Sequence, residues 1–593
     1  MADIQAYYNI STCTSGQFAA DGSILFLSNR SGMGQVWSVR PGEEPVQRTF
    51  LPDRVWSFHV APNGRDLFIS MDEGGNENEQ IFLLRDGSDT PVNLTANKAR
   101  NQFGGVTPDG KRVIYASNER SAAHFDLCAL DVETGEKRIL LENEDNYNWP
   151  ACLSPDGRYL LYNKLKGLSD DHLWMFDLET GVAKDTGKPG AYARYTAPAF
   201  LNDASAFYVC ADEDSEFSYL ARYDVKTGAL EKVYEEPWDV SRVAVSSDDR
   251  YLALLVNEDG IDALRIYDRK TSGLVNTMQP PKGVSSYWPM SWSAEGHRLL
   301  FTRTSGKAPA ALWMLDLDGK SLCEVVSMSL TVDPDELADP ELHHYTSFDG
   351  LTVPYWFYRA PKGDGAVLVD IHGGPEGQER PMYDALTQYM LSQGISIAAP
   401  NVRGSTGYGK TYTHLDDVEK RLDSVEDIDS LVQHLIAEKL ADAKRIAVMG
   451  GSYGGFMTLS CLARLPELWA AGVDVVGMTN LVTFLENTSE YRRAHRESEY
   501  GSLKDNRELL YEVSPIAKVD QIKAPLMVIH GANDPRVPVT EAEQIVENVQ
   551  SRGIDVRYLR YEDEGHGLAK RKNQLDCYPQ VAAFLKKHLT IEG

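Results

Sequence analysis

A serine between glycines follows a short apolar run in the second half of the chain. Residues 446–449 are apolar, and residues 450–455 read Gly-Gly-Ser-Tyr-Gly-Gly. Gly-x-Ser-x-Gly after a buried strand is typical of a nucleophile elbow, a sharp turn into a helix with the serine at its tip. Such a turn strains the backbone and leaves little room for side chains, a condition that glycine meets. We therefore predict that Ser452 is a nucleophile.

A base and an acid are expected after this serine, because α/β-hydrolases carry their triad in the order serine, acid, histidine. A predicted strand over 525–530 precedes a loop with Asp534, and one over 556–561 precedes a loop with His566 between two glycines. Either residue alone could be an ordinary turn or solvated loop residue. Three such residues in this order, at the ends of successive parallel strands, favour a catalytic triad.

The predicted chemistry is nucleophilic acyl transfer. His566 would take the proton of Ser452 during attack and return it to the leaving group, while Asp534 orients the imidazole. The oxyanion needs preorganised donors, and the N–H of Tyr453, next to the serine, is one candidate. The second should follow an earlier strand, where His-Gly-Gly-Pro begins at 372. We predict the Gly374 amide, with Gly373 as the alternative and an ordinary tight turn as the structural explanation.

Length and composition limit the class of protein. A chain of 593 residues needs two or more domains, and 42% apolar with 25% charged residues is ordinary for a globular protein. The net charge of −28 argues against nucleic acid or an anionic membrane as a partner. The amino terminus lacks the pattern of a signal peptide and no run has membrane-spanning length, so we expect a cytoplasmic protein. Seven scattered cysteines fit a reducing compartment and predict neither a disulfide framework nor a zinc site: Cys13, Cys128, Cys152, Cys210, Cys323, Cys461 and Cys577.

An internal repeat occupies the first half of the chain. Turns such as Asp-Gly at 21–22, 109–110 and 156–157 precede strands, and an aromatic-rich strand often closes on Asp-x-x-x-Gly. Seven copies, some degenerate, recur at roughly 42 to 47 residues, the length of a four-stranded propeller blade. We predict an all-β seven-bladed β-propeller over about 10–325. The alternative, an open solenoid, would be expected to show helical half-repeats.

A second domain follows. Residues 331–335 read as a linker and 348–357 as a hairpin, after which strands alternate with helical stretches such as 425–440. This alternation is typical of a doubly wound, mostly parallel sheet. The predicted domains are a propeller over 1–330 and an α/β-hydrolase catalytic domain over 331–593.

With these motifs together, essentially the whole chain resembles the prolyl oligopeptidase family of serine peptidases, and most closely its acylaminoacyl-peptidase branch. The motifs that carry the resemblance are His372-Gly-Gly-Pro375, Gly404-Ser-Thr-Gly-Tyr-Gly409, Gly450-Gly-Ser-Tyr-Gly-Gly455, Gly531-x-x-Asp534-x-Arg536-Val537-Pro538 and Gly565-His566-Gly567. The resemblance implies hydrolysis of short peptides, with the propeller restricting access of large folded substrates.

The resemblance also implies substrate contacts. Arg536 stands where that branch has an arginine lining the substrate site, and its alternative is a structural ion pair with a nearby acid. From their places after predicted strands, we expect Val537 and Phe484, with Met478 and Leu485, to line the pocket beside the scissile bond. The charged stretch 486–512 is expected to form a solvated helical lid.

The chain departs from the family pattern in two places. The dipeptidyl-peptidase branch binds a free amine with paired glutamates, and the pairs at 43–44 and 235–236 lack the surrounding motif of that branch. An N-terminal helix that packs on the hydrolase domain in some relatives would be short or missing.

Residues 404–411 match the phosphate-loop pattern, but Thr-Tyr-Thr-His, which follows the lysine, is a poor helix start. We therefore do not expect nucleotide binding.

The sequence thus predicts a serine peptidase that hydrolyses short, N-acylated peptides through an acyl-enzyme, without cofactor or metal. A carboxylesterase with the same triad and a dipeptidyl-peptidase-like exopeptidase are the alternatives, and an inactive binding scaffold is the least favoured. The expected partners are short peptides. A homo-oligomer, dimeric or larger, stays open.

Overall fold

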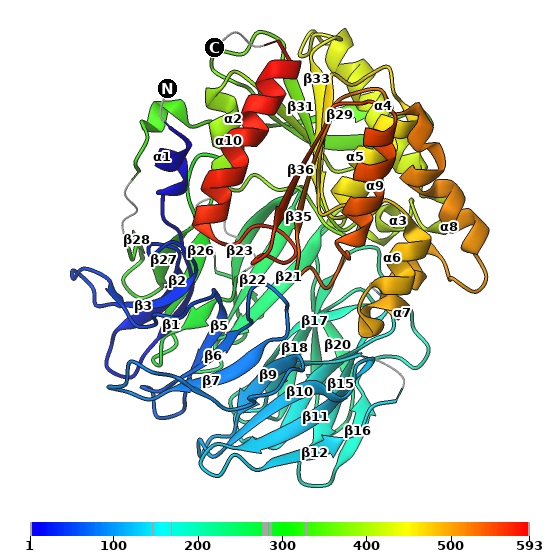
Figure 1. The fold of residues 1–593 in the computed structure, drawn as a ribbon. Coiled ribbons are helices and arrows are strands. Elements are labelled where there is room, and N and C mark those ends of the chain that lie inside the picture. Colours follow the sequence, from blue (N-terminus) through cyan, green and yellow to red (C-terminus); the bar gives the residue numbers. More distant parts are fainter. Residues whose placement is uncertain are drawn as a thin grey trace.

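The computed structural model describes residues 3–144, 147–167, 169–275, 283, 288–326 and 330–590. Figure 1 shows a body of β-sheets, from blue to green along the chain, beneath a sheet covered by helices. Within the described residues the first body consists of seven four-stranded antiparallel sheets, each built from four consecutive strands. The predicted seven-bladed β-propeller is confirmed.

The blades follow one another along the chain. The first four comprise β1 (Cys13–Phe18), β2 (Ile24–Ser28), β3 (Gln35–Val39) and β4 (Val46–Gln47); β5 (Val55–Val60), β6 (Leu67–Met71), β7 (Gln80–Leu84) and β8 (Val92–Asn93); β9 (Asn101–Val106), β10 (Arg112–Ser121), β11 (His124–Asp131) and β12 (Lys137–Leu141); and β13 (Tyr147–Leu153), β14 (Tyr159–Leu165), β15 (Asp171–Asp177) and β16 (Val182–Asp185). The last three comprise β17 (Tyr195–Phe200), β18 (Ala206–Ala211), β19 (Tyr219–Asp224) and β20 (Leu230–Tyr234); β21 (Asp239–Val245), β22 (Tyr251–Glu258), β23 (Ile261–Asp268) and β24 (Gly273–Leu274); and β25 (Ser291–Trp292), β26 (Arg298–Arg303), β27 (Ala311–Asp316) and β28 (Ser321–Glu324).

The repeated Asp-Gly pairs form the turns between the first two strands of a blade. Gly110 and Gly157 have φ of 73° and 75°, a left-handed conformation that glycine adopts without strain. The side chains of Asp109 and Asp156 accept hydrogen bonds from the backbone N–H two residues further on, at 3.1 and 3.0 Å. The repeat seen in the sequence therefore corresponds to one type of turn, which recurs between the first two strands of successive blades.

The propeller closes by packing between its first and last blades rather than by exchange of a strand. The N–H of Cys13 in β1 donates to the carbonyl of Ala310 at 2.7 Å. A buried cluster spans the junction and contains Cys13, Ile24, Phe26, Val39, Leu300, Leu312 and Val326. Closure therefore depends on apolar burial between blades that are almost 300 residues apart in the chain.

The second body is an eight-stranded sheet in the order β29-β30-β32-β31-β33-β34-β35-β36. The pairs that involve β30 are antiparallel and the remaining pairs are parallel. The strands are β29 (Glu341–Thr346), β30 (Thr352–Tyr358), β31 (Val367–Ile371), β32 (Ser396–Pro400), β33 (Ile446–Gly451), β34 (Ala471–Val475), β35 (Leu526–Gly531) and β36 (Val556–Tyr561). This is the predicted doubly wound α/β-hydrolase sheet. Its first hairpin, β29 and β30, begins at Glu341, earlier than the predicted range of 348–357.

Helices cover both faces of this sheet (Figure 1). The helices are α2 (Ala385–Ser392), α3 (Lys410–Thr413), α4 (Asp423–Ala437), α5 (Tyr453–Arg464), α6 (Leu481–Asn487), α7 (Glu490–Tyr500), α8 (Arg507–Val513), α9 (Thr540–Ser551) and α10 (Arg571–His588), with short 3₁₀ turns at Pro334–Glu336, Val418–Lys420 and Pro515–Gln521. Residues of α2 and α10 enter the apolar core on one face, and residues of α4, α5 and α9 enter the core on the other. Within the described part of the chain, no helix has the length and apolar character needed to cross a bilayer.

One segment agrees with the expectation of a short N-terminal helix, and another differs from what the sequence predicted. A short helix, α1 (Ile4–Tyr8), precedes the propeller and packs on the hydrolase domain, where Tyr7 and Tyr8 contact Tyr389 and Tyr578. The domain division at residue 330 stays a prediction. The helix α1 precedes the propeller in the chain but packs against the second domain. One helical turn, α3, does begin at Lys410, contrary to the expected poor helix start. Four residues cannot supply the helix N-terminus that a phosphate loop requires.

Replacement of Phe26 by Ala should weaken propeller closure. The Phe26 ring is fully buried between the first and last blades. We expect a loss of about 3–5 kcal/mol in unfolding free energy, the usual cost of a Phe-sized cavity. Urea unfolding followed by circular dichroism measures it, and Phe50→Ala, at a site 68% exposed, is the matched control. Equal destabilisation by the two changes would contradict closure through this cluster.

Candidate active site

The predicted elbow is present at the junction of β33 and α5. Ser452 has φ 59° and ψ −115°, a strained backbone conformation for a residue other than glycine. A Cβ on Gly454 would lie 1.9 Å from the carbonyl oxygen of Ile371, and one on Gly450 would lie 2.4 Å from that of Gly454. Close backbone packing therefore requires glycine on both sides of the serine, as the sequence predicted.

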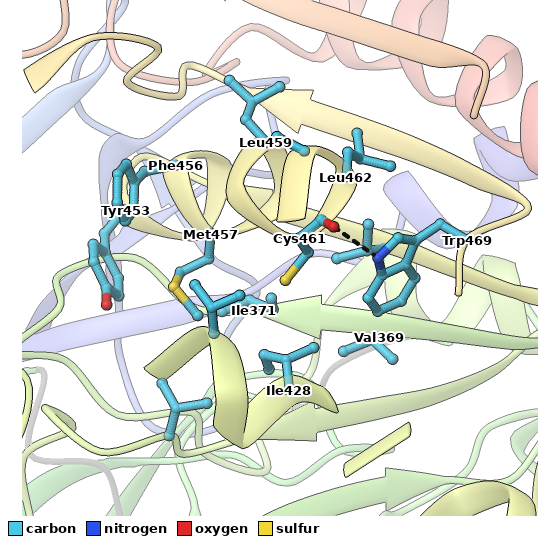
Figure 2. Close-up of a cluster of buried hydrophobic side chains, with 14 of the residues drawn as sticks. Val369, Ile371, Ile428, Tyr453, Phe456, Met457, Leu459, Cys461, Leu462 and Trp469 are labelled. Carbon is cyan, nitrogen blue, oxygen red and sulfur yellow. Dashed lines mark hydrogen bonds between the residues drawn. The ribbon is translucent and has the colours of Figure 1, made fainter. Parts of the chain in front are cut away.

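The helix that follows the serine is held by a fully buried apolar face. Figure 2 shows α5 with Phe456, Met457 and Leu459 in this cluster, next to Ile371 of β31 and Ile428 of α4. These residues are almost inaccessible to solvent. The apolar face thus fixes the start of α5, and with it the position of the serine.

His566 and Asp534 are in direct contact. The Nδ1 atom of His566 lies 2.7 Å from Oδ2 of Asp534, whose side chain is fully buried. The other carboxylate oxygen accepts hydrogen bonds from the N–H groups of Arg536 and Val537, at 2.8 and 3.1 Å. Burial raises the pKa of Asp534, but His566 and these hydrogen bonds outweigh burial and hold it below its usual value. The carboxylate is therefore ionised and can orient the imidazole.

Ser452 lies at the carboxyl end of β33, and the loops of Asp534 and His566 follow β35 and β36 in the same parallel sheet. The amide of Ser452 donates to the carbonyl of Val475 at 2.9 Å. Within the described residues its hydroxyl makes no hydrogen bond, to His566 or to any other group. The structure thus joins the acid and the histidine, and the serine–histidine contact stays a prediction.

The two predicted oxyanion donors lie in segments next to the serine. Tyr453 is the first residue of α5, so its N–H has no partner within the helix. A Cβ built on Gly373 would lie 3.5 Å from the Cβ of Ser452, which places the turn after β31 beside this serine. The carbonyl of Gly374 in that turn accepts a hydrogen bond from Arg496 of α7 at 3.3 Å. The choice between the amides of Gly373 and Gly374 stays open.

A buried ionic cluster lies behind the elbow and was not predicted. Arg421, 1% exposed, pairs with Asp416 and with Glu499 at the end of α7. The hydroxyl of Tyr453 donates to Asp416 at 3.0 Å and lies 3.3 Å from Arg421. Oxygens of Asp416, Asp417 and Glu499 are within 4.8 Å of one another, but Asp416 and Glu499 already form ion pairs with the guanidinium of Arg421. The cluster therefore ties Tyr453 to α7 rather than forming a cation site.

A hairpin loop of the propeller packs against the loops that carry Asp534 and His566. It connects β6 to β7, and a Cβ on its Gly75 would lie 2.6 Å from the amide nitrogen of Gly565. The side chain of Asn533 donates to the carbonyl of Gly74 at 3.1 Å. The propeller thus touches the loops that carry both Asp534 and His566.

The same hairpin provides Glu77, a buried carboxylate that lies close to three arginines. Glu77 forms an ion pair with Arg536, lies 3.2 Å from Arg100 and lies 3.9 Å from Arg492 of α7. Burial raises the pKa of Glu77, but the arginines outweigh burial and lower it below the usual value. Arg536 therefore forms the structural ion pair that was the alternative interpretation, and its contact with substrate stays a prediction.

Val537 and Phe484 are 2% and 3% exposed and belong to the core of the hydrolase domain. Val537 also accepts a hydrogen bond from His530 at its carbonyl. A substrate could reach these side chains only after some rearrangement, and their predicted substrate contacts stay predictions.

A cavity of about 590 Å³ lies between the propeller and α7. One wall is formed by strands β13, β17 and β21, and the other by Tyr491, Arg492, His495 and Arg496. The sequence predicted the 486–512 stretch to be a solvated helical lid. It is helical, but α7 packs its ends into the protein, with Tyr491 and Tyr500 buried.

Replacement of Arg421 by Gln should destabilise the hydrolase domain. It leaves the buried carboxylates of Asp416 and Glu499 without a counter-charge, which typically costs about 3–5 kcal/mol. Thermal unfolding measures the change, with Arg507→Gln as the control because that ion pair is exposed and worth at most about 1 kcal/mol. A melting temperature equal to that of the control would show that the cluster is not a stabilising feature.

Comparison with known proteins supports the arrangement. The model of the prolyl oligopeptidase family matches residues 381–592, and that of the prolyl oligopeptidase N-terminal beta-propeller domain matches residues 52–326. The chain is 34% identical to dipeptidyl peptidase family member 6 of Caenorhabditis elegans, over 88% of this chain and 77% of that protein. It is 26% identical to acylamino-acid-releasing enzyme 1 of rice, Oryza sativa subsp. japonica, over 41% of this chain and 33% of that protein.

The fold is shared with a solved structure of a puromycin-hydrolyzing peptidase of Mycobacterium tuberculosis. The TM-score is 0.87 at 20% identity, over 100% of this chain and 96% of that one. Similarity of both domains, in the same order and over nearly the full length, shows that this chain belongs to the prolyl oligopeptidase family and is a serine hydrolase.

Proposed function

We propose that this serine peptidase hydrolyses short, N-acylated peptides with Ser452, His566 and Asp534 as its triad. The observation that carries the proposal is the 2.7 Å contact between His566 and the buried Asp534, at the sheet edge where Ser452 occupies a strained elbow. A histidine oriented by an ionised carboxylate is the base that a serine nucleophile needs. The propeller, which touches the triad loops, would limit substrates to short chains.

The proposed reaction proceeds through an acyl-enzyme. Ser452 Oγ attacks the scissile carbonyl while His566 Nε2 takes its proton, and Asp534 stabilises the imidazolium. The N–H of Tyr453 and an amide of the turn at Gly373 and Gly374 would bind the oxyanion. His566 then protonates the leaving amine, and a water attacks the acyl-enzyme in the second half of the reaction.

The distribution of charge favours blocked over free amino termini. A free ammonium group needs an available carboxylate, but Glu77 and Glu79 are both held by Arg100 and its neighbours. In the 235–236 pair, Glu235 contacts Lys232 and Glu236 contacts Arg265. These carboxylates are therefore already compensated, as expected for an enzyme that does not bind a free amine.

Two other activities remain candidates. A relative at 34% identity is named a dipeptidyl peptidase, which supports the exopeptidase alternative. A carboxylesterase would use the same triad, because esters have better leaving groups than amides. Rates for acetyl-dipeptide anilides, free-amine dipeptide anilides and p-nitrophenyl esters, measured side by side, would separate the three activities. The proposal requires the acetylated peptide to be preferred over its free-amine form.

Replacement of Ser452 by Ala should lower turnover of an acetylated peptide anilide by at least about a thousandfold, because the nucleophile is lost while binding groups remain. A fluorophosphonate probe should label the wild-type chain and not the variant. Ser460, a buried serine within α5, is the control, since Ser460→Ala leaves the elbow intact. Full cleavage by the Ser452 variant would refute the nucleophile.

Replacement of Asp534 by Asn should lower kcat by about a thousandfold or more, because an amide cannot stabilise the imidazolium or select the reactive tautomer. KM should change much less. The comparison variant is Asp555→Asn, at an exposed carboxylate of the same domain. Unchanged kcat in the Asp534 variant would remove this residue from the proposed triad.

A further inference from the structure

The cavity between the propeller and α7 carries a charge that the proposed reaction does not use. Its charged lining residues, apart from His495, are three arginines and one aspartate: Arg242, Arg492, Arg496 and Asp171. Burial raises the pKa of Asp171 to about 7, so this carboxyl is only partly ionised at neutral pH. The cavity is therefore cationic, in a chain whose net charge is −28.

The charge of the two α7 arginines is incompletely compensated by the protein. Within the described residues Arg496 forms no salt bridge, donates a hydrogen bond to the carbonyl of Gly374 and interacts electrostatically with the buried carboxyl of Glu376. Arg492 lies 3.9 Å from the carboxylate of Glu77. That carboxylate also forms ion pairs with Arg536 and Arg100, so it is shared among three arginines. Burial, and then the neighbouring Arg496 and Arg536, lower the pKa of Arg492. Such a site gains free energy when it binds an anion.

Arg496 links the wall of the cavity to the candidate catalytic centre. Arg496 lines it and at the same time contacts the turn at Gly374, which lies beside Ser452. Apolar side chains complete the walls, including Tyr147, Pro198 and Trp149, the last 40% exposed. A volume of about 590 Å³ is within the range of pockets for small ligands, so a few peptide residues would fill it.

We propose that this cavity binds the C-terminal carboxylate of short peptide substrates, with Arg492 and Arg242 as its cationic groups and Arg496 at the boundary with the reacting bond. This inference rests on the proposed peptidase function. An N-acylated peptide has lost its ammonium group, so its terminal charge is the carboxylate, which the arginines attract. A peptide with a free amine would bring a positive charge towards the same cationic walls.

The test compares one mixed library of N-acetylated tetrapeptides in two forms, as free acids and as C-terminal amides. Cleavage is measured by mass spectrometry with the full-length enzyme at low and high salt. We expect kcat/KM to be about tenfold or more higher for the acids, mainly through KM, because a charge-assisted contact is lost in the amide. The preference should shrink as salt screens the interaction.

Two variants and a control locate the effect. Arg492→Gln and Arg242→Gln remove one charge from each wall and should each bring the acid-to-amide ratio towards one. Arg507→Gln removes an exposed charge outside the cavity and should preserve the ratio. Because the readout is a ratio within one protein, a general loss of folded enzyme cannot imitate the effect.

Equal rates for acids and amides, or a ratio unchanged in both cavity variants, would overturn the inference while leaving the peptidase function intact. Failure of the proposed function is a different result, in which neither form of the library is cleaved although Ser452 reacts with a fluorophosphonate and esters are hydrolysed.

Discussion

The hydrogen bond between His566 and the buried carboxylate of Asp534 is the interaction on which the site depends. Asp534 can remain charged out of water because the backbone amides of Arg536 and Val537 donate to it and because the histidine lies against it. Those amides belong to the loop whose Arg536 pairs with Glu77 of the propeller. Contacts from both domains therefore hold the loop of Asp534, which gives the propeller a part in the candidate site.

Helix α7 connects three features that are separate in the sequence. Near its start, Tyr491 accepts a hydrogen bond from Arg100 of the propeller, and in its middle Arg496 contacts the turn at Gly374. At its end, Glu499 pairs with Arg421, which also lies against the hydroxyl of Tyr453. A displacement of this helix would therefore alter the propeller contact, the cavity and the position of Tyr453 together.

Local chemistry made much of this arrangement predictable from the sequence. The glycines around Ser452 reflect a backbone approach that admits no Cβ, and the Asp-Gly turns reflect left-handed glycines that recur in several blades. The order of strands and loops led to the prediction of Asp534 and His566, and the structure shows these two side chains in contact. The helix predicted over 425–440 is found at Asp423–Ala437, because its apolar spacing identifies a buried face but not its ends.

The contacts that the sequence did not reveal depend on distance in the chain. Glu77 and Arg536 are 459 residues apart, and nothing near Glu77 in the sequence marks it as a partner of the loop that carries Asp534. In the sequence, nothing distinguishes Arg421 from other charged residues that precede a helix, although its side chain is almost fully buried. The stretch 486–512 is rich in charge and was expected to be solvated, since composition cannot show that Arg492 and Arg496 face an internal cavity.

The most direct test of the account is a crystal structure of the enzyme after reaction with a fluorophosphonate. The account predicts phosphonyl density on Ser452 Oγ, with His566 Nε2 within about 3 Å of that oxygen and Nδ1 still bonded to Asp534. An adduct on another residue, or an imidazole at 566 that remains out of reach of the modified serine, would contradict it.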